Sequence, residues 1–195
     1  MAYSLLTAQQ DDIICPLTHY SLIEITGTDA EKYLQGQLTC DVTKLAVGES
    51  TLTAHCDPKG KMSALFRLIR QDEQTFYMLL KSALLPSALD QLKKYAVFSK
   101  VTFTLLDWQI LGAAGTKAIE KCGQFSAQIR IDVKAQQPRM ILLNPTRLAL
   151  EPTVEAEAWD LLDIQDGVPG LAPATQLEFI PQALNLQSIE QPWGF

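Results

Sequence analysis

The segment from residue 50 to residue 70 constrains the fold of this chain more than any other part of its sequence. Asp57-Pro58-Lys59-Gly60 has proline and glycine where a tight turn favours them. The residues on either side, 50–56 and 61–70, have the composition of strands, so the pattern predicts a β-hairpin. Strands joined by a tight turn are antiparallel, and we therefore expect a mostly antiparallel sheet.

A strand and a helix are expected before this hairpin. Residues 22–25 (LIEI) are typical of a strand. Thr28 and Glu31 have the spacing of a capping box, in which each side chain accepts a backbone N–H at the start of a helix. Leu34 and Leu38 follow at the spacing of a buried helix face. The Gln-Gly-Gln segment at 35–37 is expected to end this helix.

The hairpin is followed by a strand, a helix and a further strand. The strands are expected over 75–80 and 101–105. Pro86 fits the first turn of a helix over 86–94, whose apolar residues recur every three or four positions. This β-β-β-α-β order is typical of an antiparallel sheet with a helix on one face.

A second α/β segment is expected after residue 111. Its strands are predicted near 129–133 and 140–144, and a helix over about 154–163 carries Trp159.

Composition indicates a globular protein of the cytoplasm. Of the 195 residues, 47% are apolar and 19% charged, which is enough to bury a core. No segment resembles a secretory signal or is apolar for long enough to span a membrane. The four cysteines contain no C-x-x-C pair and there are only two histidines, so we expect reduced thiols and no metal site.

Charge is distributed unevenly along the chain, whose net charge is −6. Residues 51–105 contain eight Lys or Arg against four Asp or Glu, whereas eight acidic and no basic residues follow Arg147. The basic middle segment could attract nucleic acid, or the chain could simply have two solvated surfaces of opposite sign. The sequence leaves both interpretations open.

Three runs of sequence point to a known family. They are YLQGQLTCDV at 33–42, LKKYAVFSKV at 92–101 and FIPQALNLQ at 179–187. Together they resemble the YgfZ family of folate-binding proteins associated with tRNA modification, which is related to the aminomethyltransferase (T-protein) of glycine cleavage. In that family a Lys-Gly-Cys-Tyr-x-Gly-Gln-Glu motif follows the third run, and this chain stops at Phe195 before it.

The resemblance implies an α+β fold of two intertwined subdomains, each with an antiparallel sheet flanked by helices. Residues 1–49 and 106–195 are expected to form a discontinuous folate-binding subdomain. Residues 50–105 are expected to form an inserted ferredoxin-like subdomain. The C-terminal β-barrel of full-length relatives is expected to be absent.

The resemblance also implies tetrahydrofolate as the cofactor. Aligned from Ile25-Thr26-Gly27 and from Gly167, two family tryptophans fall on Tyr20 and Trp159, whose rings are expected to hold the flat folate between them. A family glutamate falls on Gln165, and Asp166 is the carboxylate that could replace it at the polar edge of the pterin. Three more residues match the family's binding pattern: Gln35, Gln37 and Asp41.

A structural role is the alternative for each of these residues. Trp159 could be a core anchor, Gln165-Asp166-Gly167 a turn that closes a helix, and Asp41 a brace for a loop. The basic side chains of the middle segment could hold phosphates or a folate polyglutamate tail, or form a solvated face. They are Lys59, Lys61, Arg67, Arg70, Lys93, Lys94 and Lys100.

No catalytic residue is assigned. The asparagine of T-protein is missing here, and the position of its catalytic aspartate falls near Ala88 or Leu89. Asp90 lies one or two residues further on, and each helical residue turns the side chain by about 100°. His55 and Cys56 adjoin within a strand and face opposite ways, so they are poorly placed as a nucleophile pair.

The main interpretation is a YgfZ-like tetrahydrofolate-binding protein without transferase chemistry. The resemblance links it to tRNA modification and to maintenance of iron-sulfur enzymes, with tRNA or tRNA-modifying iron-sulfur enzymes as partners and no membrane. One alternative is an authentic folate-dependent aminomethyltransferase. Another is a shortened, non-catalytic interaction module, whose open cleft would expose apolar surface and drive homodimerisation.

Overall fold

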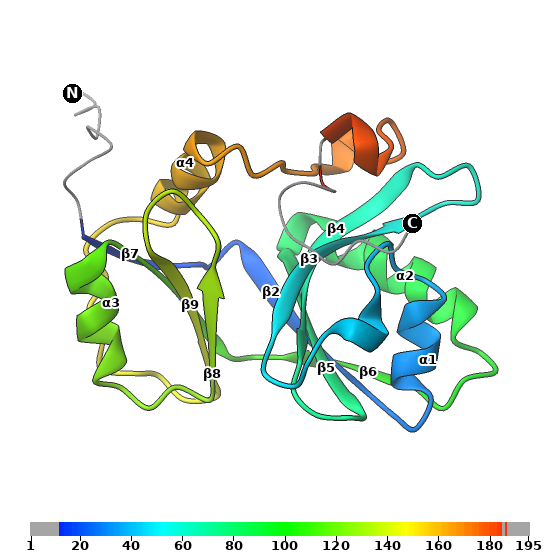
Figure 1. Cartoon of the computed structure of the whole chain (residues 1–195), viewed down its shortest axis with the longest axis horizontal. Helices are drawn as coiled ribbons and strands as arrows, with labels where there is room; N and C mark the ends of the chain where they lie inside the picture. The colour runs from blue at the N-terminus through cyan, green and yellow to red at the C-terminus, as the bar shows by residue number, and fades with distance from the viewer. Residues whose placement is uncertain (1–11, 185, 187–195) are drawn as a thin grey trace. The chain divides into compact units, whose positions relative to one another are not determined.

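The chain divides into two compact units in the computed structural model, which describes residues 12–184 and 186 (Figure 1). Within this range, unit 1 comprises residues 12–18 and 108–167. Unit 2 comprises residues 19–107, 168–184 and 186. Each unit contains one antiparallel sheet, so the predicted α+β class with antiparallel sheets flanked by helices is confirmed.

Unit 2 contains a five-stranded sheet in the order β3-β4-β5-β2-β6. Its strands are β2 (Tyr20–Thr26), β3 (Ser50–Cys56), β4 (Met62–Arg70), β5 (Thr75–Lys81) and β6 (Thr102–Leu106). Its helices are α1 (Ala30–Gln35), α2 (Leu85–Tyr95) and the short 3₁₀ turns η1 (Val42–Lys44), η2 (Ser82–Leu84), η3 (Pro173–Thr175) and η4 (Pro181–Leu184).

The predicted hairpin is confirmed as β3 and β4. The N–H of Gly60 donates to the carbonyl of Asp57 at 2.9 Å, and the Asp57 carboxylate accepts the N–H of Lys59 and of Lys61. Asp57 therefore braces the turn from both sides, the usual role of an aspartate at this position. The predicted helix after Pro86 is also confirmed, and it buries Ala88 and Leu92 against the core.

The start of α1 differs from the prediction. Asp29 occupies the N-cap, and no side chain makes a capping hydrogen bond there, so the predicted Thr28–Glu31 capping box is wrong. Glu31 instead pairs with Arg70 of β4 at 2.5 Å, and the Asp29 carboxylate accepts the N–H of Lys100 at 2.8 Å. Partners distant in sequence have replaced the local ones.

Unit 1 contains a four-stranded sheet in the order β1-β7-β9-β8. Its strands are β1 (Ile13–Pro16), β7 (Gln109–Ala114), β8 (Ile129–Val133) and β9 (Arg139–Asn144), and its helices are α3 (Thr116–Gly123) and α4 (Glu157–Gln165). Strands β1 and β7 and helix α3 were not predicted from the sequence. The first turn of α3 is capped from a distance, because the Asp12 carboxylate accepts the N–H of Lys117 and of Ala118.

The two units differ from the subdomains expected at 1–49 with 106–195 and at 50–105. Strand β2 pairs with both β5 and β6 along most of its length, which places residues 20–26 in the same sheet as the hairpin. Across the part of the chain described here, no helix is long and apolar enough to cross a membrane.

Candidate functional site

Trp159 lies in the core of unit 1, where α4 packs on the sheet. Its side chain is only 2% exposed. The guanidinium of Arg139, at the start of β9, lies 4.1 Å from the centre of its ring, within the range of a cation–π contact. Gly112 of β7 lies against the ring so closely that a Cβ there would come within 2.5 Å of Cε3. Trp159 is therefore a core anchor, and a ligand could stack on it only after Arg139 moved.

Two carboxylates complete this cluster. Arg139 donates from Nη1 to Asp166 at 2.8 Å and from Nη2 to Asp163 at 2.5 Å, and its own side chain is fully buried. Asp166 also accepts the N–H of Gln136 at 3.2 Å. We call Arg139, Trp159, Asp163 and Asp166 the Arg139 cluster. It fixes the C-terminal half of α4 to the sheet.

Gln165 and Asp166 play different roles at the end of α4. The N–H groups of Asp166 and Gly167 donate to carbonyls of the last helical turn, and Gly167 has φ +68°, so this segment closes the helix. The side chain of Asp166 points into the Arg139 cluster. Gln165 is exposed. The binding roles predicted for Trp159, Gln165 and Asp166 stay predictions.

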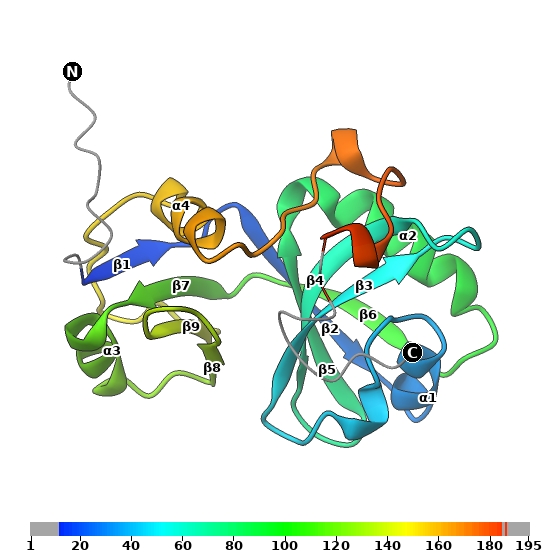
Figure 2. The same ribbon diagram turned by 45° about the horizontal axis from the view of Figure 1, so that its top comes forward.

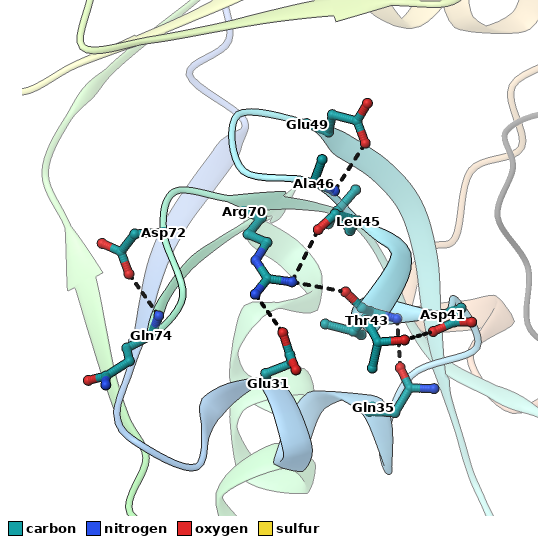
Figure 3. Close-up of polar contacts among 11 residues, drawn as sticks. Glu31, Gln35, Asp41, Thr43, Leu45, Ala46, Glu49, Arg70, Asp72 and Gln74 are labelled. Atoms are coloured by element: carbon teal, nitrogen blue, oxygen red, sulfur yellow. Dashed lines mark hydrogen bonds and ion pairs between the residues drawn. The ribbon is translucent and has the colours of Figure 1, made fainter.

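Gln35 and Asp41 stabilise the segment between α1 and β3 (Figure 3). Gln35 accepts the N–H of Val42 through Oε1 at 2.7 Å. Asp41 accepts the hydroxyl of Thr43 at 2.6 Å and pairs with Lys44 at 3.1 Å, and these two contacts lower the pKa of its carboxyl. Asp41 thus braces the loop. The neighbouring Gln37 is half-buried between α1 and η1.

Arg70 holds this segment in place from β4. Besides its ion pair with Glu31, it donates to the backbone carbonyls of Val42 and Leu45 at 3.5 and 3.2 Å (Figure 3). Its guanidinium lies 5.4 Å from the centre of the Phe76 ring. The structural roles of Arg70 and Arg139 were not predicted from the sequence. The only local signal was that each stands at one end of an apolar strand.

Tyr20 begins β2 in unit 2, whereas Trp159 belongs to unit 1. The Tyr20 side chain is half-buried, and its ring meets that of His19 edge-on with centres 4.8 Å apart. The prediction that Tyr20 and Trp159 hold one ligand between them stays a prediction.

His55 is bonded within the sheet rather than to Cys56. Its Nδ1 lies 2.5 Å from the hydroxyl of Ser63 on the facing strand. Burial raises the pKa of all four cysteine thiols, to about 12 for Cys15 and about 11 for Cys56, so they are protonated at neutral pH. A buried, protonated thiol is a poor nucleophile.

The buried imidazole should make the stability of the protein sensitive to acid. Burial lowers the pKa of His55 below its usual value near 6.5, so on acidification the unfolded state binds a proton first. The contribution is present above about pH 6.5 and is lost as the pH falls through 6.5 towards the folded pKa. We expect His55→Asn to flatten the fall of the unfolding free energy between about pH 7.5 and 5.5, measured by urea unfolding. Equal slopes for wild type and variant would refute this role.

Comparison with known proteins places the chain in a family. The model of the GCVT N-terminal domain matches residues 5–149. The chain belongs to the GCVT N-terminal domain family. The fold agrees: the aminomethyltransferase T of the glycine cleavage system from Bartonella henselae superposes with a TM-score of 0.59 at 16% identity, covering 68% of this chain and 41% of that one.

Similar curated proteins confirm the predicted resemblance to YgfZ. The "tRNA-modifying protein YgfZ" of Photobacterium profundum is 35% identical over 194 residues, which is 89% of this chain. An uncharacterized protein of Haemophilus influenzae is 55% identical over 92% of this chain. The chain spans about three fifths of the length of these curated relatives, 59% and 62% respectively.

The extent of the GCVT N-terminal domain match separates the predicted site residues into two groups. Tyr20, Gln35, Gln37 and Asp41 lie within residues 5–149, whereas α4 with Trp159, Gln165 and Asp166 follows the matched range.

Proposed function

We propose that this chain binds tetrahydrofolate and serves tRNA modification without carrying out aminomethyl transfer. The observation that carries the proposal is the similarity to relatives named tRNA-modifying protein YgfZ, which extends over about nine tenths of the chain. Folate is proposed as the ligand because the three sequence runs resemble the folate-binding YgfZ family. Because the chain spans only part of those relatives, their role is part of the proposal.

The placement of helix α2 supports the absence of transfer chemistry. The position of the T-protein aspartate falls on Ala88 or Leu89, and both pack into the core of unit 2. The carboxylate of Asp90 lies on the exposed side of the helix. A group that assists transfer must touch the reacting atoms, and no carboxylate stands at the buried position.

The residues fit folate unequally. In this conformation Trp159 and Asp166 are poorly placed to contact folate directly. The guanidinium of Arg139 covers the Trp159 ring and donates a hydrogen bond to the Asp166 carboxylate. Gln165 does fit, since its exposed amide can both donate to and accept from the polar edge of a pterin. We therefore propose Gln165, rather than Asp166, for pterin recognition in unit 1. Tyr20 is the candidate stacking ring in unit 2.

Ligand-dependent thermal unfolding tests this assignment. A ligand that binds only the folded state raises the melting temperature with concentration, so tetrahydrofolate at micromolar levels should stabilise the wild-type chain. Gln165→Ala is expected to weaken binding about 2- to 12-fold, the equivalent of one ordinary hydrogen bond. Gln124→Ala is the matched control, because Gln124 is likewise an exposed glutamine at a helix end in unit 1. If Gln165→Ala and Gln124→Ala bind tetrahydrofolate with equal affinity, Gln165 does not recognise the pterin.

An assay of glycine cleavage separates this proposal from an authentic aminomethyltransferase. With tetrahydrofolate and the partner proteins of glycine cleavage present, we expect no turnover above background. Turnover would show that the transferase interpretation is correct.

A further inference from the structure

The segment between α2 and β6 exposes aromatic and aliphatic side chains to solvent. Phe98 is 101% exposed, Val97 72% and Tyr95 46%. In Figure 2 this segment is the green loop that runs from the end of α2 towards β6. Single exposed apolar residues are common, but a group of them is typical of an interaction site.

The exposed side chains are held in a fixed turn. The N–H of Ser99 donates to the carbonyl of Ala96 at 2.9 Å, which closes a β-turn with Val97 and Phe98 at its centre. The next residue is clamped on α1, because the N–H of Lys100 donates to the Asp29 carboxylate at 2.8 Å. Phe98 is thus presented by a braced turn, whose backbone needs little further ordering to bind a partner.

Three lysines lie close in sequence to the exposed rings. Between residues 90 and 105 there are three lysines, Lys93, Lys94 and Lys100, against the single acid Asp90, in a chain of net charge −6. All three lysines are exposed, and Nζ of Lys94 lies 5.9 Å from the centre of the Tyr95 ring. Asp29, at the N-cap of α1, accepts the N–H of Lys100.

We propose that this surface, formed by Lys93, Lys94, Tyr95, Phe98 and Lys100, binds single-stranded RNA. Unpaired bases stack on aromatic rings while amines contact the adjacent phosphates, and this surface offers both within eight residues of chain. Charge favours an anionic partner. Phe98 lies in a turn rather than on the apolar face of an amphipathic helix, the usual element for binding a bilayer surface, and a ring beside amines suits stacked bases. The inference deepens the proposed role in tRNA modification and rests on it, but it does not depend on folate binding.

Fluorescence anisotropy with a labelled single-stranded oligoribonucleotide tests the proposal on the full chain. The wild type should bind the single strand more tightly than a fully paired RNA duplex. Phe98→Ala should weaken binding about 5- to 150-fold, the range measured for removing one stacking ring, whereas Phe98→Trp should keep it. Lys94→Gln should reduce the slope of log affinity against log salt concentration by about 0.7.

Matched controls come from exposed residues of unit 1. Ile164→Ala removes an apolar side chain that is 73% exposed, and Lys134→Gln removes an exposed lysine; both should bind RNA as the wild type does. Phe98→Leu keeps apolar surface without a π face, so wild-type affinity in this variant would overturn the stacking proposal. Absence of RNA binding at low salt would overturn it, and so would binding to anionic phospholipid vesicles that Phe98→Ala abolishes while RNA binding is unaffected.

The same variants separate this inference from the proposed function. Phe98→Ala should bind tetrahydrofolate with wild-type affinity. If the wild-type chain binds folate but not RNA, this inference alone is wrong. RNA binding without folate binding would remove only the folate part of the proposed function.

Discussion

Arg139→Met should lower the free energy of unfolding by about 3–5 kcal/mol, the usual cost of removing one partner of a buried ion pair. Arg139 is fully buried and neutralises two carboxylates at once, with Asp166 itself almost fully buried. Methionine keeps most of the side-chain volume beside Trp159 but removes the guanidinium that both carboxylates share. The loss should therefore arise from electrostatics rather than from a cavity.

Urea unfolding followed by circular dichroism measures this effect. The control is the triple variant Arg139→Met, Asp163→Asn, Asp166→Asn, which removes the two charges as well and should recover at least half of the loss. Arg139→Lys should fall between wild type and the methionine variant, because one ammonium cannot match two carboxylates as a guanidinium does. A loss below about 1 kcal/mol in Arg139→Met would contradict the structural role given to the Arg139 cluster.

Gly27→Ala should destabilise the protein by about 2–6 kcal/mol, since backbone strain and a steric clash add. Gly27 follows β2 with φ +146°, a conformation that side chains disfavour. A Cβ there would lie 1.8 Å from the carbonyl oxygen of Lys100, so the backbone of the turn that presents Phe98 would have to move.

Gly60→Ala provides the control, measured in the same urea unfolding experiment. Gly60 also has a positive φ, +78°, but nothing lies within 4 Å of a Cβ at that position. It should cost only about 1–2 kcal/mol of backbone strain. If both variants lose the same stability, the close approach of Gly27 to Lys100 has no energetic consequence. The turn that presents Phe98 would then not be held rigidly against this part of the chain.

Local sequence signals were sufficient for much of the fold. The Asp57–Gly60 turn and Pro86 act through the conformation of their own backbone, so the hairpin and α2 could be predicted from neighbouring residues. Helix α3 was missed because its first turn is capped by Asp12, more than a hundred residues away in sequence. The capping box at α1 was wrong because Glu31 binds Arg70.

The same reasoning explains what could be predicted of the candidate site. Asp41 contacts residues two and three positions away, so its bracing role was within reach of the sequence. The environment of Trp159 was not, because it depends on Arg139 of β9 and Gly112 of β7, which only the folded sheet brings together. A family resemblance can assign Trp159 and Asp166 to a site. It gives no sign that the buried Arg139 already contacts both of them.

Isothermal titration of tetrahydrofolate into the wild-type chain tests the central proposal most directly. We predict saturable binding at one site per chain with a dissociation constant in the micromolar range, equivalent to about −8 kcal/mol. Absence of any binding heat up to millimolar ligand, at two temperatures so that a vanishing enthalpy is excluded, would contradict the assignment of this chain as a folate-binding protein.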